Sequence, residues 1–379
     1  MKKFLLFLLM VAAVTGLAAC NREYEIAMIT DSGDIDDRSF NQGTWEGIKD
    51  YAEANDITYK YYKPTEVSFD AYVAAIDLAA KGGAKVVITP GFLFENSVHK
   101  AQTLYPEITF IIIDGSPNNV SDWGDDDTPP TFYEGDEMDF TIEDNTLSIF
   151  FQEEQSGFLA GYAAYKEGLT NLGFMGGQAV PAVIRFGVGY VAGAYYAAEE
   201  AGDMSYSFDA NYYEYLNTFQ GGADIVSKAD AWYSAGVQAI HAAAGGAGSS
   251  VMTSAQNAEK WMIGVDVDQS NLNDYVLTSA TKGLAIAVNE ALEAYYGGTF
   301  EGGRSIVLGA ADDAVGLPTS ASSWRFETFT IAEYEAIFAL IADGDITVPV
   351  MGSDLGTYIT ELGFAANQAI ATKATDYQA

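Results

Sequence analysis

Short apolar runs alternate with longer amphipathic segments along the first third of the chain. The apolar runs have the length of buried strands, and the segments between them repeat their apolar residues at helical spacing. Alternation of this kind predicts a parallel sheet with helices on both faces. The expected strands are 26–30, 57–62, 85–89 and 109–114, and the expected helices begin at about Phe40 or span 69–81 and 97–105.

A second alternating series follows and predicts a second sheet of similar size. Its expected strands are 146–151, 171–175, 205–216, 237–241 and 261–265, with helices over 155–166, 185–201, 223–235 and from about Ser249. A strand at 275–279, a helix over 283–295 and short strands near 306–308 and 314–317 look like a return toward the first sheet. A further helix is expected over 330–342, and the segment from Gly352 has helical character without a clear place.

These patterns predict an α/β protein with two lobes, each a mostly parallel sheet with helices on both faces. We expect the first lobe to comprise 24–145 plus about 270–305, and the second 146–269 plus about 306–379. A cleft between two such lobes, at the carboxyl ends of their strands, is the expected ligand site.

The polar loop Asp31–Arg38 lies between the first strand and the first helix. Ser39 and Gln42 have the spacing of a capping box, so the helix should begin at about Phe40. Phe40, Gly47, Ile48 and Tyr51 would then share its inner face.

The segment 115–139 interrupts the strand and helix alternation with three prolines and the run Asp125-Asp126-Asp127. A calcium loop is one interpretation, but the aspartate spacing differs from that of an EF-hand. We therefore expect a solvated surface excursion.

Charge and residue usage narrow the range of functions. The formal net charge of −35 argues against nucleic acid and against a basic membrane-binding patch as partners. Cys20 is the only cysteine and His99 and His241 are the only histidines, which leaves no cysteine metal cluster and no clear catalytic triad. The glycine-rich stretches 187–193 and 245–250 lack the spacing of a dinucleotide fingerprint and the lysine of a phosphate loop, so no cofactor is expected. Backbone N–H groups near Gly246 could still meet a neutral ligand at a helix start.

The amino terminus has the form of a signal peptide. Lys2 and Lys3 precede an apolar run that is too short to span a bilayer, and Leu17-Ala18-Ala19-Cys20 resembles a bacterial lipobox. We expect residues 1–19 to be removed and Cys20 to carry lipid. The protein would then be anchored to the cell membrane on its extracytoplasmic face.

The stretch from Ile29 to Gln42 closely resembles the first motif of the basic membrane protein family, lipid-anchored substrate-binding proteins of ABC importers that include a purine nucleoside receptor. Further matches stand in the same order along the chain, at 91–94, 153–161, 264–269 and 276–282. The resemblance implies a type I periplasmic-binding-protein fold and capture of nucleosides, with purines as the expected class, for delivery to an ABC permease. The choice between purine and pyrimidine stays open at this stage.

The resemblance also implies roles for individual residues. Asp31 and Asp266 would accept hydrogen bonds from ribose hydroxyls, and Lys282 would donate one. Phe40 and Phe219 would stack on the base, an interaction worth roughly 1–3 kcal/mol per base. Asn41 and Glu153 would contact the edge of the base.

Two alternatives remain from the sequence alone. The same fold could bind a sugar or another small polar molecule. Thr30–Asp37 is also similar to the acidic amino-terminal loop of calcium-dependent nucleoside hydrolases, although one extra residue separates Gly33 from Asp36-Asp37.

The anchoring hypothesis gives a first prediction. Replacement of Cys20 by alanine (Cys20→Ala) removes the thiol that would carry the lipid, so the protein should move from the membrane to the soluble fraction. Fractionation followed by calorimetry should show this shift with unchanged ligand affinity. A variant that stays with the membrane would contradict lipid attachment at this residue.

Overall fold

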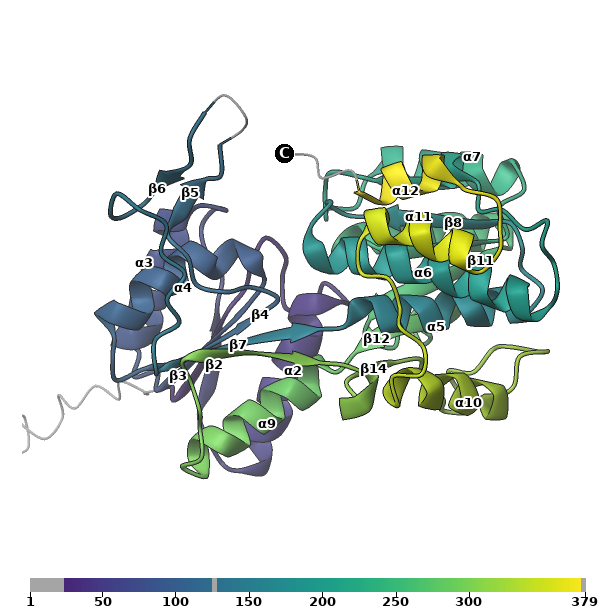
Figure 1. Cartoon of the computed structure of the whole chain (residues 1–379). Coiled ribbons are helices and arrows are strands. Elements are labelled where there is room, and N and C mark those ends of the chain that lie inside the picture. The colour runs from purple at the N-terminus through teal and green to yellow at the C-terminus, as the bar shows by residue number, and fades with distance from the viewer. Residues whose placement is uncertain (1–23, 125–127, 376–379) are drawn as a thin grey trace, which may run out of the picture.

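A computed structural model describes residues 24–124 and 128–375. The expected signal peptide, Cys20 and the run Asp125–Asp127 lie outside these ranges. The described residues fold into two α/β lobes, each built on one six-stranded sheet (Figure 1). This confirms the predicted fold class.

The first lobe contains a parallel sheet in the order β13–β7–β4–β3–β1–β2. Alternate residues of β1 point to opposite faces, as the strand period requires. Ile26 and Met28 pack toward helices α2 and α9, whereas Ala27 and Ile29 pack toward α3 and α4. The elements are β1 (Ile26–Ile29), α2 (Phe40–Ala54), β2 (Tyr59–Tyr62), α3 (Phe69–Lys81), β3 (Val86–Pro90), α4 (Glu95–Leu104), β4 (Thr109–Ile113), β7 (Thr146–Phe151), α9 (Leu284–Tyr296) and β13 (Arg304–Leu308).

The second lobe contains a sheet in the order β14–β12–β11–β10–β8–β9, in which only the short edge strand β14 of the described strands runs antiparallel. Helices α5 and α6 cover one face, and α7 and α8 cover the other. The elements are α5 (Glu153–Lys166), β8 (Leu172–Gly176), α6 (Pro181–Glu200), β9 (Tyr213–Tyr215), α7 (Ala223–Ser234), β10 (Ala239–Ala243), α8 (Gly248–Ala258), β11 (Trp261–Asp266), β12 (Val276–Lys282) and β14 (Val315–Gly316).

The carboxyl-terminal helices belong to the second lobe. Helix α10 (Ile331–Ala342) packs on α5, while α11 (Gly352–Glu361) and α12 (Gln368–Thr375) lie against α6. Figure 1 shows α11 and α12 in yellow and α10 in yellow-green on the outside of that lobe. The segment from Gly352 therefore lies in the second lobe, the lobe to which the range 306–379 was assigned from the sequence.

The chain crosses from one lobe to the other at the carboxyl ends of strands, and not in the loops that precede those strands. Strand β7 belongs to the first sheet and β12 to the second, so lobe limits at 145/146 and 269/270 are each wrong by one strand. Strand β13 also lies wholly in the first sheet, which moves the limit near 305 past Leu308. The sequence suggested breaks at the polar loops that precede β7 and β12. The actual crossings fall at the strand ends, which face the cleft.

The tyrosine-rich segment 205–216 is the clearest local error. Only Tyr213–Tyr215 form a strand (β9), and Ala210–Tyr212 form a 3₁₀ turn capped by the side chain of Asp209. Tyr206 and Phe208 are buried without strand pairing, so their apolar character reflects packing.

The excursion 115–139 contains a small hairpin of β5 (Val120–Asp122) and β6 (Thr131–Phe132). Its base is fastened to the first lobe by amide side chains. Asn96 donates to the carbonyl oxygens of Asn118 and Val120, and Asn119 donates to those of Glu134 and Glu137. The hairpin stands above the first lobe beside the space between the lobes (Figure 1).

Helices α5 and α6 approach closely enough for their backbones to touch at glycines. A Cβ atom at Gly161 would lie 1.9 Å from the carbonyl oxygen of Tyr190, and one at Gly189 would lie 1.9 Å from that of Glu154. The glycine-rich stretch 187–193, which lacks the spacing of a dinucleotide fingerprint, lies at this contact. Gly189 and Gly193 permit close helix packing, whereas Gly187 leaves room for Tyr213 and Phe174 of the sheet.

This contact predicts that Gly161→Ala lowers the free energy of unfolding by about 1–3 kcal/mol, because the methyl group meets backbone that cannot move aside. Gly248→Ala is the matched helical control, since its Cβ atom would lie 3.6 Å from the terminal methyl of Met262, an ordinary contact. Denaturant titration of both variants checks the prediction. Equal stability of the two would contradict the packing argument.

Candidate functional site

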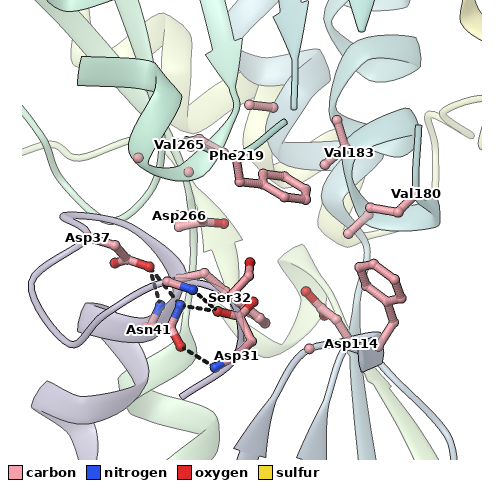
Figure 2. Close-up of a pocket in the computed structure, with 18 of the residues that line it drawn as sticks. Asp31, Ser32, Asp37, Asn41, Asp114, Val180, Val183, Phe219, Val265 and Asp266 are labelled. Atoms are coloured by element: carbon pink, nitrogen blue, oxygen red, sulfur yellow. Dashed lines mark hydrogen bonds between the residues drawn. The ribbon is translucent and has the colours of Figure 1, made fainter. Parts of the chain in front are cut away.

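A cavity of about 880 Å³ lies between the lobes, at the carboxyl ends of strands from both sheets. Asp31, Phe40 and Asp114 line it from the first lobe, and Phe219 and Asp266 line it from the second. Figure 2 shows Asp31 and Asp114 from the first lobe and Phe219 and Asp266 from the second around one space. A site at this edge is what the fold class predicts.

Asp37 fixes the start of helix α2. Its Oδ1 accepts hydrogen bonds from the backbone N–H groups of Ser39 (2.9 Å) and Gln42 (3.1 Å), and its Oδ2 accepts from that of Asn41 (3.0 Å). The predicted capping box is therefore wrong, although the helix begins at Phe40 as expected. Asp37 takes the role assigned to Ser39, since a carboxylate at a helix amino terminus also interacts favourably with the helix dipole.

Asn41 holds Asp31 in place. Its Nδ2 donates to Asp31 Oδ1 (2.8 Å) and to Asp37 Oδ2 (2.8 Å), and its Oδ1 accepts from the backbone N–H of Asp31 (3.2 Å). Both hydrogens of the amide are used within the loop, as Figure 2 shows. In this conformation Asn41 has no donor left for a ligand and acts on the site through Asp31.

Lys282 is buried between carboxylates that come from both lobes. Its Nζ donates to Asp114 Oδ2 and lies 3.4 Å from Glu153 Oε1 and 3.7 Å from Asp266 Oδ1. The ammonium also lies 4.5 Å from the centre of the Phe40 ring. Asp114 comes from the first lobe and Asp266 from the second, so this one ammonium joins the two lobes.

Asp114 and Asp266 occupy equivalent places at the ends of β4 and β11. Both adopt positive φ angles, 55° and 65°, which turn the chain sharply at the cleft edge. Asp266 Oδ2 accepts a hydrogen bond from Ser39 Oγ, and Asp114 Oδ1 is buried with no protein partner. Since Asp114 lines the cavity, this oxygen is a candidate acceptor for a donor of the ligand.

Glu153 lies behind the cavity and does not line it. The fully buried carboxylate sits between Lys282 and Arg185, with 3.3 Å from its Oε2 to Arg185 Nη1. In this conformation it positions the two cations, and the direct contact with a base edge expected from the sequence is not available to it.

Burial raises the pKa of three carboxyl groups in or beside the cavity, those of Asp31, Asp266 and Glu153. It raises the pKa of Asp31 to about 6 and also raises the pKa of Asp266, against the opposing effect of Lys282. Burial and the charge of Asp114 raise the pKa of Glu153. Burial alone would lower the pKa of Lys282, but Asp114, Asp266 and Glu153 together raise it.

Phe40 and Phe219 bring one phenyl ring from each lobe to the cavity. Phe40 begins α2, and Phe219 follows β9 and contacts the loop of Gly245. Gly246 lines the cavity beside it, on the 3₁₀ turn Gly245–Ala247 that leads into α8. The lobes also meet through hydrogen bonds from Gln269 Nε2 to the carbonyl oxygen of Arg38 (2.8 Å) and from Gln220 Nε2 to that of Ser32 (3.4 Å).

The structure brings most of the expected site residues to the cavity: Asp31, Phe40, Asn41, Phe219, Gly246, Asp266 and Lys282. Their ligand contacts stay predictions. Sequence reasoning missed Asp114 and Arg185. A signal for Asp114 existed, because it ends a buried strand of the first sheet at the same edge as Asp31. Arg185 lies within a helix and had no comparable signal.

Among the residues that the structure describes, no helix has both the length and the apolar character needed to cross a bilayer. Within the same ranges, no group of three or more histidine, cysteine or acidic side chains is arranged to hold a metal ion.

Comparisons with known proteins point to one group. A family model described as ABC transporter substrate-binding protein PnrA-like (Bmp) matches residues 24–344. A "CD4+ T-cell-stimulating antigen" of Listeria innocua is 31% identical, over 87% of this chain and 89% of that protein. An "ABC transporter nucleoside-binding protein BmpA" of Lactococcus lactis is 28% identical over 86% and 89%. A solved solute-binding protein of an ABC transporter system from Aeropyrum pernix has a TM-score of 0.70 at 19% identity, over 93% and 100% of the two chains.

The buried charge cluster predicts a large effect of Lys282→Met. Removing one partner of a buried ion pair typically costs about 3–5 kcal/mol of unfolding free energy, because Asp114 loses its ion pair and the positive charge that offsets Glu153 and Asp266 is removed. Protonation relieves the excess negative charge, and the raised pKa values of Glu153 and Asp266 place the loss of stability at rising pH, so the deficit should be larger at pH 8 than at pH 5. Lys63→Met is the control, since the Lys63–Asp34 pair is exposed and such pairs contribute about 0–1 kcal/mol. Similar denaturation midpoints for both variants would refute the importance of the cluster.

Proposed function

Because the chain belongs to the Bmp family of PnrA-like ABC transporter substrate-binding proteins, we propose that it captures nucleosides outside the cytoplasm and delivers them to an ABC permease. One observation carries the proposal. Each lobe supplies a phenyl ring and a carboxylate to the same cavity, Phe40 with Asp31 and Phe219 with Asp266. The printed name of the Lactococcus relative, a nucleoside-binding protein, supports the same ligand class.

The chemistry of these groups suits the two parts of a nucleoside. Phenyl rings from opposite lobes can stack on a flat base, and every base offers such a face. Ionised carboxylates accept stronger hydrogen bonds than neutral groups and so suit ribose hydroxyls. Lys282 and the unpartnered Asp114 Oδ1 add a donor and an acceptor near the hinge.

Purine nucleosides are the class we propose, since a cavity of about 880 Å³ accommodates the larger bases. Nucleotides should bind poorly. Asp31, Asp37 and Asp266 line the cavity together with Asp34, Glu95 and Asp114, and its cations Lys63, Lys282 and Arg185 each pair with an acid. A phosphate would meet an excess of negative charge at short range.

Capture would proceed by hinge closure. The chain crosses between the lobes at the ends of β7, β12 and β13, and the ligand would contact both lobes and so favour the closed arrangement. Lipid on Cys20 would keep the protein beside its permease. Binding, without turnover, would be the activity.

The hydrolase alternative is the less favoured. Each oxygen of Asp37 already accepts two N–H hydrogen bonds, which suits a helix cap better than a calcium ligand. A sugar on the same fold remains the second candidate. Phenyl rings supplied by both lobes favour a flat base over a sugar alone.

Asp266 provides the decisive test of the ribose contact. In the wild type, 2′- or 3′-deoxyinosine should bind ten- to hundredfold more weakly than inosine, because a missing hydroxyl leaves a desolvated carboxylate oxygen unpaired, at a cost of roughly 1.5–3 kcal/mol. Asp266→Asn keeps an acceptor for Ser39 but removes the charge, so the two affinities should converge. Calorimetry on the four pairings gives the coupling energy.

Asp34→Asn is the matched control, because Asp34 also lines the cavity but pairs with Lys63 at the exposed mouth. It should keep the full preference for the ribonucleoside. The inosine recovered after each titration should be intact. A coupling near zero would remove Asp266 from the ribose site, and release of hypoxanthine over many turnovers would overturn the binding function.

A further inference from the structure

The cavity has two chemically different halves. Figure 2 shows Asp37, Asn41 and Asp31 on one side and Val180 and Val183 on the other, with Phe219 and Asp266 between them. Most of the groups that the proposed function assigns to a nucleoside lie in the polar half or between the halves, and Asp114 lies toward Val180. The apolar side chains around Val180 have no role in that proposal.

The apolar half is lined by side chains from both lobes. Phe92 and Phe150 come from the ends of β3 and β7, and Trp123 comes from the hairpin of the 115–139 excursion. Val180, Pro181 and Val183 face them from the start of α6. The two cations near this half are already paired with acids, Arg185 with Glu153 and Lys282 with Asp114. They therefore do not make it a binding site for an anion.

Trp123 is unusual among these residues, because 60% of it is exposed although it lines the cavity. Its ring stacks on Phe140, with 6.1 Å between ring centres and 25° between planes. Trp123 directly follows strand β5, and the base of this hairpin is fastened through Asn96, Asn119 and Glu95, whose carboxylate accepts from the backbone N–H of Ser116 and from Asn118 Nδ2. An exposed indole at the edge of the cavity is available to cover a ligand.

The size of the cavity supports a ligand that is larger than a simple nucleoside. Its volume of about 880 Å³ lies near the upper end of the range of roughly 300–1,000 Å³ found for pockets that enclose drug-sized molecules. A nucleoside in the polar half would leave the apolar half unfilled. Apolar walls gain free energy only when an apolar group covers them.

We propose that the apolar half is a second subsite, which takes an apolar substituent carried by the nucleoside, and that Trp123 is its outer wall and a determinant of specificity. The proposal rests on the proposed function and deepens it. The preferred ligands would be nucleosides with an uncharged alkyl, alkylthio or aryl group on the ribose or on the base.

The test compares adenosine with 5′-deoxy-5′-methylthioadenosine and with N6-benzyladenosine, which carry the apolar group at opposite ends of the molecule. Burial of one methylene group corresponds to about a fourfold gain in affinity, so the substituent that reaches the subsite should strengthen binding about tenfold. Calorimetry measures the affinities for the wild type and for Trp123→Ala. The variant should bind adenosine within about twofold of the wild type and should lose most of the gain from the substituent.

Tyr133→Ala is the matched control, because Tyr133 is an exposed aromatic residue of the same excursion that stacks on Phe69 and does not line the cavity. It should keep the full gain. If adenosine binds but neither substituted nucleoside binds more tightly, the subsite is refuted and nucleoside capture stands. An equal gain in Trp123→Ala refutes the role of Trp123, and failure of all three ligands to bind refutes the proposed function itself.

Discussion

The site depends on one buried ammonium. Lys282 is almost inaccessible to solvent, and it offsets the negative charge of three carboxylates in a medium of low polarity. Its partners come from both lobes, with Asp114 from the first and Asp266 and Glu153 from the second. The ammonium therefore balances the charge of the site and holds the facing ends of the two sheets together.

Much of the fold could be predicted from the sequence, because its strands and helices depend on local patterns of apolar and capping residues. Buried parallel strands such as β4 are continuous apolar runs, and helix α3 begins at the side-chain cap of Ser68 and ends at Gly82, as the residues there predict. The lobe limits could not be predicted in the same way. Which sheet a strand joins depends on pairing between distant segments, such as β13 with β7. The sequence of either strand alone does not indicate its partner.

The candidate site could likewise be predicted only in part. Residues at strand ends and in the first loop could be placed at the cleft, because the carboxyl edge of a parallel sheet is fixed by topology. Their partners could not. Whether Asn41 points at a ligand or at Asp31 and Asp37, and whether Glu153 lies in the cavity or behind Lys282, depends on side-chain contacts across the fold. The wrong prediction of a cap at Ser39 has the same origin. The Asp37 carboxylate caps the helix instead, and the Ser39 hydroxyl donates to Asp266 of the other lobe.

The crossings between the lobes have a consequence for motion. Only Gln152 separates β7 from α5, and only Gly283 separates β12 from α9. The residues beside these two joints are Glu153 and Lys282, which pair with each other. A rotation of one lobe against the other must turn the backbone at these joints, and it would carry Asp114 with one lobe and Lys282 with the other. Opening of the protein and rearrangement of its buried charges are thus parts of a single movement, so the electric field in the cavity would change with the angle between the lobes.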